Sequence, residues 1–599
     1  MMPAALSIDT LRKAAIHVGD EVDPPVEFAA HELQRYLGTM IGRPLPIRRT
    51  ALLRGGNMLQ IGVQAGTPAP PESLGYCVLP ERDRITLTAR TPRLLLDAVY
   101  TLLAQLGCRW SLHGPDEEVV PLLSGSTIEL APIECTPPFR LRGYTSDIMT
   151  WHYTQPEDLH DRLPDDRAFI DWMGKSGANT FFYIRHPFDT QLTIPELLPE
   201  FTKRGFDLEY GGHVIPLLLP RDLFAAHPEY FPESPDGVRS EYGNLCTSNS
   251  AALATVSGNA VQCVRDYPEM RALHIWGADL WNGGWCRCAA CAPLNAQDQS
   301  LRVCNAVARG LAAAGVARPV CYLAYHDTLD ATLTLRPEAN VVAEFAPRER
   351  CYGHALSDPA CVTNRRYAAA LERYVERFDG RVRLFEYYGD AILYFGCAVP
   401  LTRVIAADLA YFERLGIREI LMLQFGAFST WAYPLNFLTF AATTAGVPGS
   451  TDCEDYWRRY GRHAAATRAA FAEVEDSMRD VVIYGDIRRP PRAPEQAAAV
   501  LRGVEKALPR LAAVAQRLAV LGDEPLAAQA ALVRYTYAVL DAVRQDLQDT
   551  VAGRPPSAAE RYAEALPIIE AVDRRFKGLW GSVDLPIIHS FFAAAAAVE

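Results

Sequence analysis

Five carboxylates stand at or just after the ends of short apolar segments in the middle of the chain, each with an aromatic residue nearby. They are Asp147, Asp279, Asp327, Glu344 and Glu386. A pair of carboxylates can cleave a glycosidic bond, because one protonates the leaving oxygen while the other acts as base or nucleophile. Aromatic side chains are typical of the walls of such small-molecule sites. This combination of residue types predicts a sugar-cleaving site.

Three of these carboxylates are our candidates for catalysis: Glu386, Asp279 and Glu344. Glu386 lies between aromatic residues, and low polarity raises a carboxyl pKa toward the range of a general acid. Glu344 ends the preceding apolar segment, and neighbouring strands lie roughly 5 Å apart, so we expect the two glutamates to face each other. Asp279, from an earlier segment, would bracket the bond from the other side. The structural alternatives are an ion pair for Glu386, pairing of Glu344 with Arg348 or Arg350, and a turn cap for Asp279.

A larger set of residues is expected to contact the substrate: Asp147, Arg185, His213, Trp276, Asp327, Arg350, His354 and Tyr387. The two aspartates suit the binding of hydroxyl groups better than proton transfer. The segment from Arg348 to His354 is unusually polar, and its guanidinium groups match carboxylates or several hydroxyls. It therefore points to an acidic or acetamido sugar, with a solvated loop as the alternative.

Four cysteines form a separate group. Cys286, Cys288 and Cys291 follow a Cys-x-Cys-x-x-Cys spacing, and thiolates this close suit a soft tetrahedral ion, usually zinc. Cys246 is the expected fourth ligand, because loops after adjacent strands lie side by side. Four thiolates leave no open position, so we predict a structural zinc site and no cofactor for catalysis.

The elements that must position these residues are eight short apolar segments, most of them followed by a segment with helical character. Eight such units predict a (β/α)₈ barrel, an α/β fold whose chemistry lies at the carboxyl ends of the strands. The segment between Asp327 and the next expected strand is short, so we expect the helix that follows the fifth strand to be reduced. The eight expected strands are Leu141–Asp147, Thr180–His186, Val214–Pro220, Leu273–Asp279, Val320–Asp327, Val341–Glu344, Val382–Glu386 and Ile420–Gln424.

Three domains are expected along the chain. Residues 1–135 combine short strands with two amphipathic helices, which predicts a small α/β domain. Residues 136–450 hold the barrel, and residues 451–599 are alanine-rich and amphipathic, which predicts a helical domain.

Composition excludes several classes of partner. The net charge of −12 over 599 residues argues against nucleic acid and against an anionic membrane surface, which both require a basic face. No apolar run approaches the ~20 residues of a membrane span. The amino terminus lacks the apolar core of a secretion signal, so the chain as written is expected to be cytoplasmic, or exported if it is a processed form. No nucleotide-binding glycine motif and no Gly-x-Ser-x-Gly is present. The expected partner is an oligosaccharide or glycan, and the sequence does not fix an oligomeric state.

Several motifs resemble a known family. The segments Ala29–Leu37 and Leu102–Trp110 resemble the amino-terminal domain that precedes the barrel in α-glucuronidases and β-hexosaminidases. Residues 10–445 as a whole resemble proteins that contain the domain of unknown function 4838, which include glycoside hydrolase family 163. One departure is Ala278-Asp279, where Asn-Asp is expected in many relatives. The motifs are Gly211–His213, Asn244–Thr247, Trp285–Cys291, Arg350–His354, Asp358–Cys361 and Glu386–Tyr388.

The resemblance implies an activity. Family 163 is described as endo-β-N-acetylglucosaminidase on complex N-glycans, so it implies a glycoside hydrolase acting on β-linked N-acetylhexosamine, with Glu386 or Asp279 as acid. The second step uses either a protein carboxylate or the substrate's own acetamido group. Two alternatives stay open: an exo-acting uronidase, with Arg348 or Arg350 holding the substrate carboxylate, and a non-catalytic carbohydrate-binding protein.

Overall fold

The structure is a computed structural model, and most of the chain is described in it. The described residues are 3–20, 22–49, 58–61, 75–81, 84–112, 114, 117–146, 156–184, 187, 194–280, 283–316, 318–330, 332–391, 393–424, 432–446, 453–482, 487, 490–522, 524–555, 565, 567–568 and 571. None of the helices among them is both long and apolar enough to cross a membrane.

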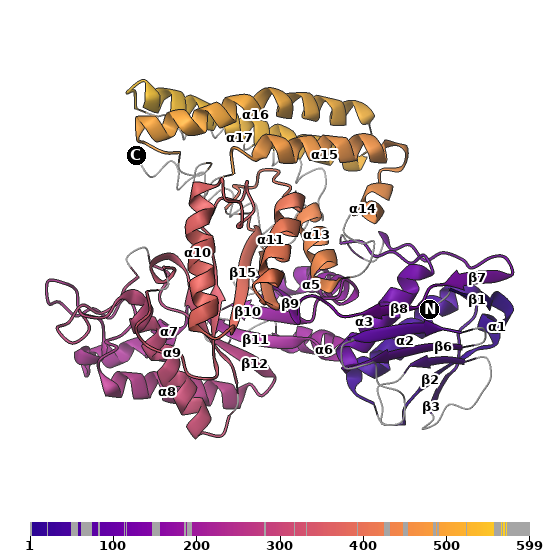
Figure 1. The fold of residues 1–599 in the computed structure, drawn as a ribbon, viewed down its shortest axis with the longest axis horizontal. Helices are drawn as coiled ribbons and strands as arrows, with labels where there is room; N and C mark the ends of the chain where they lie inside the picture. The colour runs from indigo at the N-terminus through magenta and orange to yellow at the C-terminus, as the bar shows by residue number, and fades with distance from the viewer. Residues whose placement is uncertain are drawn as a thin grey trace.

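The amino-terminal part is built on a six-stranded sheet of order β3-β2-β4-β6-β5-β8. Helices α2 (Pro24–Ile41) and α3 (Pro92–Gln105) pack against this sheet. A two-stranded ribbon of β1 (Ala4–Ser7) and β7 (Thr127–Leu130) and the short helix α1 (Ile8–Lys13) complete it (Figure 1). The strands of the larger sheet are β2 (Ala15–Val18), β3 (Ile47–Arg49), β4 (Met58–Ile61), β5 (Tyr76–Pro80), β6 (Arg84–Ala89) and β8 (Ile133–Cys135).

The middle of the chain forms a closed barrel of eight parallel strands, which confirms the predicted (β/α)₈ fold. Pairing runs in chain order from β9 to β16, and β16 closes back onto β9. The strands are β9 (Leu141–Ser146), β10 (Thr180–Ile184), β11 (Asp207–Gly212), β12 (Met270–Ile275), β13 (Val320–Ala324), β14 (Val341–Phe345), β15 (Val382–Gly389) and β16 (Glu419–Gln424).

The third strand differs from the prediction. It is β11, whereas the predicted strand Val214–Pro220 contains the short helix α7 (Ile215–Leu218). Gly211 and Gly212 both have φ of +115° and end β11. A Cβ on Gly211 would lie 2.2 Å from the carbonyl oxygen of His274, so the glycine permits close contact between the strands. His213 therefore follows the third strand, at the carboxyl end where a barrel carries its chemistry.

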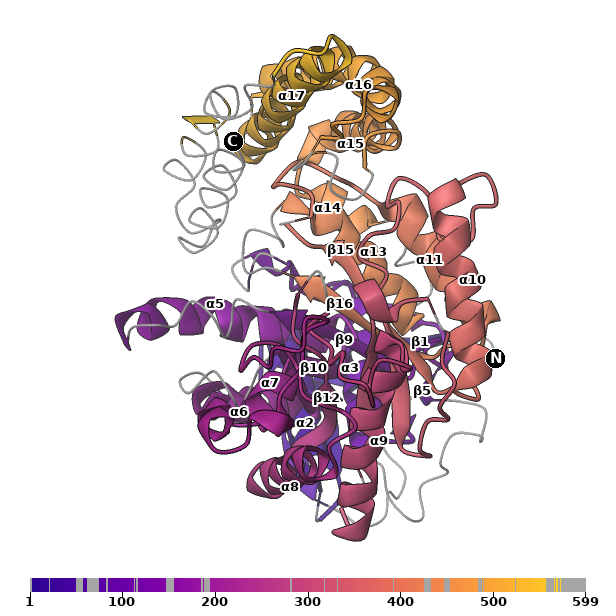
Figure 2. The same ribbon diagram turned by 90° about the vertical axis from the view of Figure 1, so that its left-hand side faces the viewer.

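Helices surround the barrel, but after β13 the described residues form only a short 3₁₀ turn, η4 (His326–Thr328), as the short segment predicted. Figure 2 shows α8 and α9 on one side of the barrel and α10, α11 and α13 on another. The helices are α5 (Pro156–Lys175), α6 (Ile194–Arg204), α8 (Ser250–Asp266), α9 (Ala296–Ala313), α10 (Val362–Arg377), α11 (Thr402–Arg414) and α13 (Pro434–Ala445).

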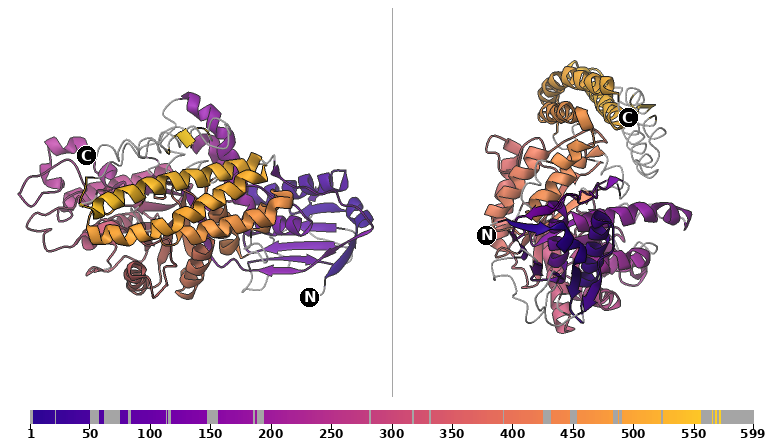
Figure 3. Two further views of the ribbon diagram at one scale, coloured as in Figure 1. Left: turned by 90° about the horizontal axis from the view of Figure 1, so that it is seen from above. Right: turned by 90° about the vertical axis from the view of Figure 1, so that its right-hand side faces the viewer.

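After the barrel the chain is helical: α14 (Glu454–Arg458), α15 (Ala464–Met478), α16 (Pro494–Leu521) and α17 (Glu524–Val551). The last three lie side by side, as Figure 3 shows from above. Tyr535 donates a 2.8 Å hydrogen bond to the carbonyl oxygen of Phe395, and Thr402 donates one of 2.7 Å to Glu475. These helices therefore pack on the loop that follows β15.

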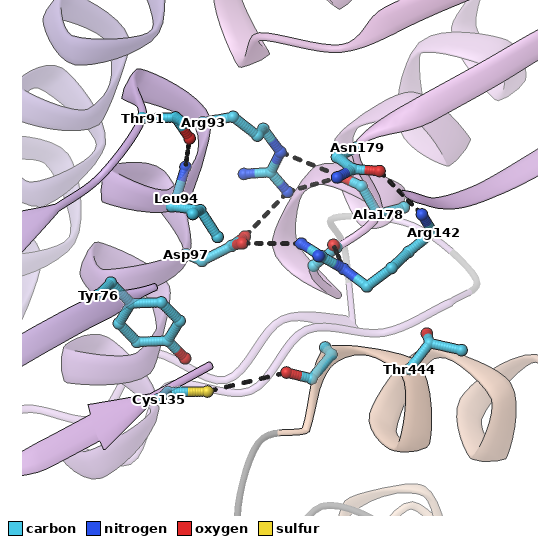
Figure 4. A network of polar contacts seen from close by, with 12 residues as sticks. Tyr76, Thr91, Arg93, Leu94, Asp97, Cys135, Arg142, Ala178, Asn179 and Thr444 are labelled. Carbon is cyan, nitrogen blue, oxygen red and sulfur yellow. Dashed lines mark hydrogen bonds and ion pairs between the residues drawn. The ribbon is translucent and has the colours of Figure 1, made fainter. Parts of the chain in front are cut away.

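The amino-terminal part contacts the barrel through a buried ion-pair network (Figure 4). Asp97 on α3 binds both Arg93 and Arg142, at 3.0 Å each. Arg142 lies near the start of β9 and also donates to the carbonyl oxygen of Gly177. The contact is therefore at the amino ends of the strands, away from the barrel mouth.

Candidate active site

Contacts across the barrel identify the side chains that point toward its axis. Phe182 on β10 stacks on His274 of β12, with ring centroids 3.7 Å apart. Arg383 on β15 donates a 2.6 Å hydrogen bond to Glu209 on β11. These strands are not neighbours, so the side chains meet inside the barrel. Because successive residues of a strand point to opposite faces, Phe385 and Tyr387 point inward with Arg383, whereas Glu386 points outward.

His274 links two carboxylates inside the barrel. Its Nε2 lies 2.9 Å from Glu209 Oε2, and its Nδ1 lies 2.8 Å from Glu344 Oε2. Burial opposes a charge on the ring, but neighbouring acidic groups, Cys321 and Glu344 among them, raise the pKa of His274 well above its usual value. Both ring nitrogens then carry protons and donate to the carboxylates.

Glu209 is stabilised as an anion by its partners in this network. Burial alone would raise its pKa, but the Arg383 guanidinium and His274 lower the pKa of Glu209 to about 2. Opposite charges at hydrogen-bond distance outweigh desolvation here. Glu209, His274 and Arg383 were not predicted as site residues. For Glu209, the alternation of polar and apolar residues in 207–210 was the available signal.

Glu344 has one fixed and one uncommitted oxygen. Trp276 Nε1 donates to Oε2 at 3.2 Å, beside the bond from His274. Its Oε1 has no hydrogen-bond partner among the described residues. The side chain has no exposed surface, so Glu344 lies beneath the mouth, below the aromatic layer that includes Trp276.

Aromatic rings form that layer at the carboxyl ends of β11 to β15. The Trp276 ring lies 5.1 Å from His213 and 5.5 Å from Phe385, and Tyr325 lies 6.3 Å from His213. His213 Nδ1 is 2.6 Å from the carbonyl oxygen of Gly277, so this nitrogen donates a proton and the ring orientation is fixed. The predicted residues His213 and Trp276 are thus together.

Charged groups surround Tyr387 at the same end of the barrel. The Arg348 guanidinium lies 5.7 Å from the Tyr387 ring centroid and donates to Asp390 at 3.1 Å. Burial and then nearby acidic groups, Tyr325, Asp390 and Asp279 among them, raise the pKa of Tyr387 well above its usual value, with Arg348 acting in the opposite sense. Asp279 is exposed and within electrostatic range of this phenol.

Asp327 lies on the loop after β13, beside the loop that follows β12. Burial raises its pKa, and a hydrogen bond from Trp285 acts in the opposite sense. Its carboxylate occupies the space beside Gly283, where a Cβ would lie 1.9 Å from Oδ2. Asp327 therefore contributes to the same rim, whereas the predicted residues Asp147 and Arg185 lie outside the described residues.

Glu386 and Arg350 lie elsewhere, in a buried cluster between β15 and α11. Arg350 binds Asp408 of α11 and lies 3.5 Å from Glu386. Tyr352 donates to Glu386 at 3.2 Å, and Tyr388 donates to Asp408 at 3.0 Å. Two carboxylates thus share one guanidinium. The expectation that Glu386 and Glu344 face each other is not met, because β15 presents Glu386 to the outer helices.

Burial, opposed by Arg350 and reinforced by Asp408, raises the pKa of Glu386 to about 7. His354 belongs to this outer region too, because its carbonyl oxygen accepts from Asn364 at 3.0 Å. Its Nδ1 lies 3.3 Å from Cys351 Sγ. The low-polarity setting expected for Glu386 is therefore present, but not at the barrel mouth.

The four predicted zinc ligands are brought together. Cys246, Cys286, Cys288 and Cys291 are all buried, and their sulfur atoms lie within 4.8 Å of one another. None of the four is in a disulfide. Three of the cysteines belong to the same loop after β12 that carries Asp279, and Cys246 belongs to the connection that precedes α8.

The fold and these contacts define a (β/α)₈ barrel protein with an aromatic and acidic mouth, flanked by an amino-terminal α/β part and a helical part. The chain belongs to the family of the domain of unknown function DUF4838, whose model matches residues 127–440. The match is to this wider family, and a place in glycoside hydrolase family 163 stays a prediction. Comparison with curated protein sequences finds no match.

Two solved structures share the architecture. One is a GH115 4-O-methyl-α-glucuronidase with specificity for decorated arabinogalactans, with 13% identity and a TM-score of 0.60 over 95% of this chain and 77% of that chain. The other is a GH138 enzyme targeting pectin rhamnogalacturonan II, with 12% identity and a TM-score of 0.54 over 96% of this chain and 74% of that chain. At these identities the likeness concerns the fold.

Proposed function

We propose that the protein is a glycoside hydrolase whose active site is the carboxyl-terminal mouth of the barrel. The observation that carries this proposal is the convergence of Trp276, His213, Tyr325 and Tyr387 beside the exposed carboxylate of Asp279. Rings of this kind accommodate a sugar, and an acid next to them can protonate a glycosidic oxygen. The two similar barrels are both named as glycoside hydrolases or glucuronidases, which supports the same class.

Asp279 is the proposed general acid, and Glu344 is the proposed second carboxylate. Asp279 is exposed at the rim, where a leaving-group oxygen can reach it. Glu344 has no exposed surface and an uncommitted oxygen, so it suits electrostatic stabilisation of a positive transition state rather than attack on a sugar carbon. Glu386, turned toward α11, has no part in this proposal.

The burial of Glu344 favours the version in which the substrate supplies its own nucleophile. A 2-acetamido group can attack the anomeric carbon, which needs one protein acid and no exposed protein nucleophile. We therefore propose β-linked N-acetylhexosamine-containing glycans as substrates. For a uronidase, the predicted substrate-binding arginines were Arg348 and Arg350. Arg350 is buried with Asp408, and Arg348 is paired with Asp390.

The test is hydrolysis of a panel of aryl glycosides and N-glycans by the purified protein. We expect release from N-acetylhexosaminides and a fall of about 10²- to 10⁴-fold in kcat/KM for Asp279→Asn, the usual contribution of a general acid. Glu338→Gln is the matched control, because Glu338 is a surface carboxylate paired with Arg309. Activity only on uronosides would reject the proposed substrate class.

A non-catalytic carbohydrate-binding protein is distinguished by the same panel. Such a protein would bind glycans through the rings without turnover, and Asp279→Asn would leave binding intact. Glycan binding with no hydrolysis of any panel member would therefore reject the hydrolase proposal.

A further inference from the structure

We infer that Cys246, Cys286, Cys288 and Cys291 bind one zinc ion that holds two loops of the barrel mouth together. Cys246 Sγ lies 3.7 Å from Cys288 Sγ and 3.8 Å from Cys291 Sγ. A tetrahedron of sulfurs with zinc–sulfur bonds of about 2.3 Å has edges of about 3.8 Å. A disulfide would need a separation of about 2.05 Å. These two distances match the edges of such a tetrahedron, and all four sulfurs lie within 4.8 Å of one another.

The surroundings of the sulfurs suit thiolates. The backbone N–H of Glu233 donates to Cys286 Sγ at 3.4 Å. The hydroxyls of Ser248 and Thr247 lie 3.0 and 3.5 Å from Cys291 Sγ. Zinc with four thiolates carries a net charge of −2, and hydrogen-bond donors around the sulfurs lower the cost of burying it.

A cation also lies next to the cluster. Arg239 pairs with Glu233 at 3.0 Å and donates to the carbonyl oxygen of Phe231 at 2.6 Å, and its guanidinium lies within electrostatic range of Cys246 and Cys286. A guanidinium fixed beside the sulfurs compensates part of the negative charge of a zinc–tetrathiolate centre. Buried cysteines that serve only as small apolar side chains are neutral, so a nearby guanidinium would not stabilise them.

The cluster joins two segments that are far apart in the sequence. Cys246 belongs to the loop between β11 and α8, and the other three belong to the loop between β12 and α9. Asn244, two residues before Cys246, continues the same connection. Its Nδ2 donates to the carbonyl oxygen of Gly283 at 2.6 Å, and its Oδ1 accepts from the N–H of Ala278 at 2.7 Å.

The ion would therefore fix the segment that carries Asp279. Ala278 precedes Asp279, so the hydrogen bond from Asn244 is made next to the proposed acid. Four protein ligands leave no position for water or substrate, so the role of the ion is structural. The metal site itself is independent of the proposed function, whereas its effect on Asp279 rests on it.

Elemental analysis of the purified full-length protein tests the site directly. After dialysis against metal-free buffer, we expect about one zinc per chain. Cobalt substituted for zinc should give the visible absorption bands of a tetrahedral thiolate centre. Less than a tenth of an equivalent of zinc, or iron in its place, would overturn the inference, and neither result depends on glycosidase activity.

Two cysteine variants give a matched comparison. Cys288→Ser should lose the zinc, whereas Cys304→Ser should keep it, because Cys304 is buried against the carbonyl oxygen of Ile275 and is not part of the cluster. Should Cys288→Ser not fold, chelator treatment of the wild-type protein replaces it. Removal of zinc should then lower the melting temperature and increase protease cleavage between residues 277 and 295. Full zinc retention in folded Cys288→Ser, or no change in melting temperature after removal, would contradict the role proposed here.

Discussion

Glu344 and Glu386 stand on neighbouring strands, both are fully buried, and yet they belong to different environments. Glu344 is part of the network inside the barrel, with His274 and Trp276. Glu386 is part of the cluster between β15 and α11, with Arg350 and Asp408. The position of a carboxylate along a barrel strand is therefore not enough to identify a catalytic group. The face of the strand on which it lies decides whether it can meet a substrate.

The two environments also differ in their balance of charge. Inside the barrel Glu209 has two cationic partners, His274 and Arg383, and its pKa is lowered to about 2, although burial alone would raise it. In the outer cluster Glu386 and Asp408 share Arg350, and burial raises the pKa of Glu386 to about 7. The outer cluster has two carboxylates and one guanidinium, and below about pH 7 a proton on Glu386 neutralises the second negative charge.

The largest expected effect is a difference in activity between variants of the two glutamates. Glu344→Gln should lower kcat/KM for the best panel substrate by about 10²-fold or more, because it removes a charge beneath the reacting sugar. Glu386→Gln should leave kcat/KM within a few-fold of wild type. Equal losses in the two variants, with both folded by circular dichroism, would return Glu386 to the mechanism.

The next effect is on stability. Arg350→Met should lower the free energy of unfolding by about 3–5 kcal/mol, because two buried carboxylates lose the cation that they share. Urea denaturation followed by fluorescence measures this loss. Arg366→Met is the control, since Arg366 pairs with Asp330 on the surface and exposed pairs contribute about 0–1 kcal/mol. Similar losses in both variants would show that the outer cluster is not held by Arg350.

A smaller effect is the pH dependence of the outer cluster. The pKa of Glu386 rises from 4.5 to about 7 on folding, so the folded chain binds an extra proton between these values. Its contribution to stability is therefore complete below pH 4.5 and is lost as the pH rises through about 7. Relative to the Glu386→Gln variant, the free energy of unfolding of the wild type should fall by roughly 3 kcal/mol over this pH interval. A difference that stays flat from pH 4.5 to 8 would contradict the raised pKa.

Much of the barrel could be predicted from the sequence, because most of its strands are largely apolar segments of ordinary length. The third strand, β11, could not be predicted, since it begins with Asp207, carries Glu209 inward and ends in two glycines. Glu209 is compensated by Arg383, which lies 174 residues further along the chain. A prediction based on a short stretch of sequence cannot identify a partner so far along the chain.

The candidate site was predictable to a different degree at each position. The cysteine cluster could be predicted because ligand spacing is local and adjacent loops meet. The outward direction of Glu386 could not, because Val382–Gly389 is buried on both faces and shows no alternation that would mark one face as internal. His213 was predicted to contact the substrate, but its place directly after a strand could not be predicted, because β11 precedes the segment that was expected to be the strand.

The ion pair between Asp97 and Arg142 links the amino-terminal part to the barrel. Asp97 lies on α3 in the amino-terminal part, yet it neutralises Arg142 on β9, the strand that meets β16 to close the barrel. A shortened chain starting after residue 135 would have to bury that guanidinium without its counterion. We therefore expect a barrel without α3 to be less stable than the full chain, because the charge of Arg142 would be buried without its partner.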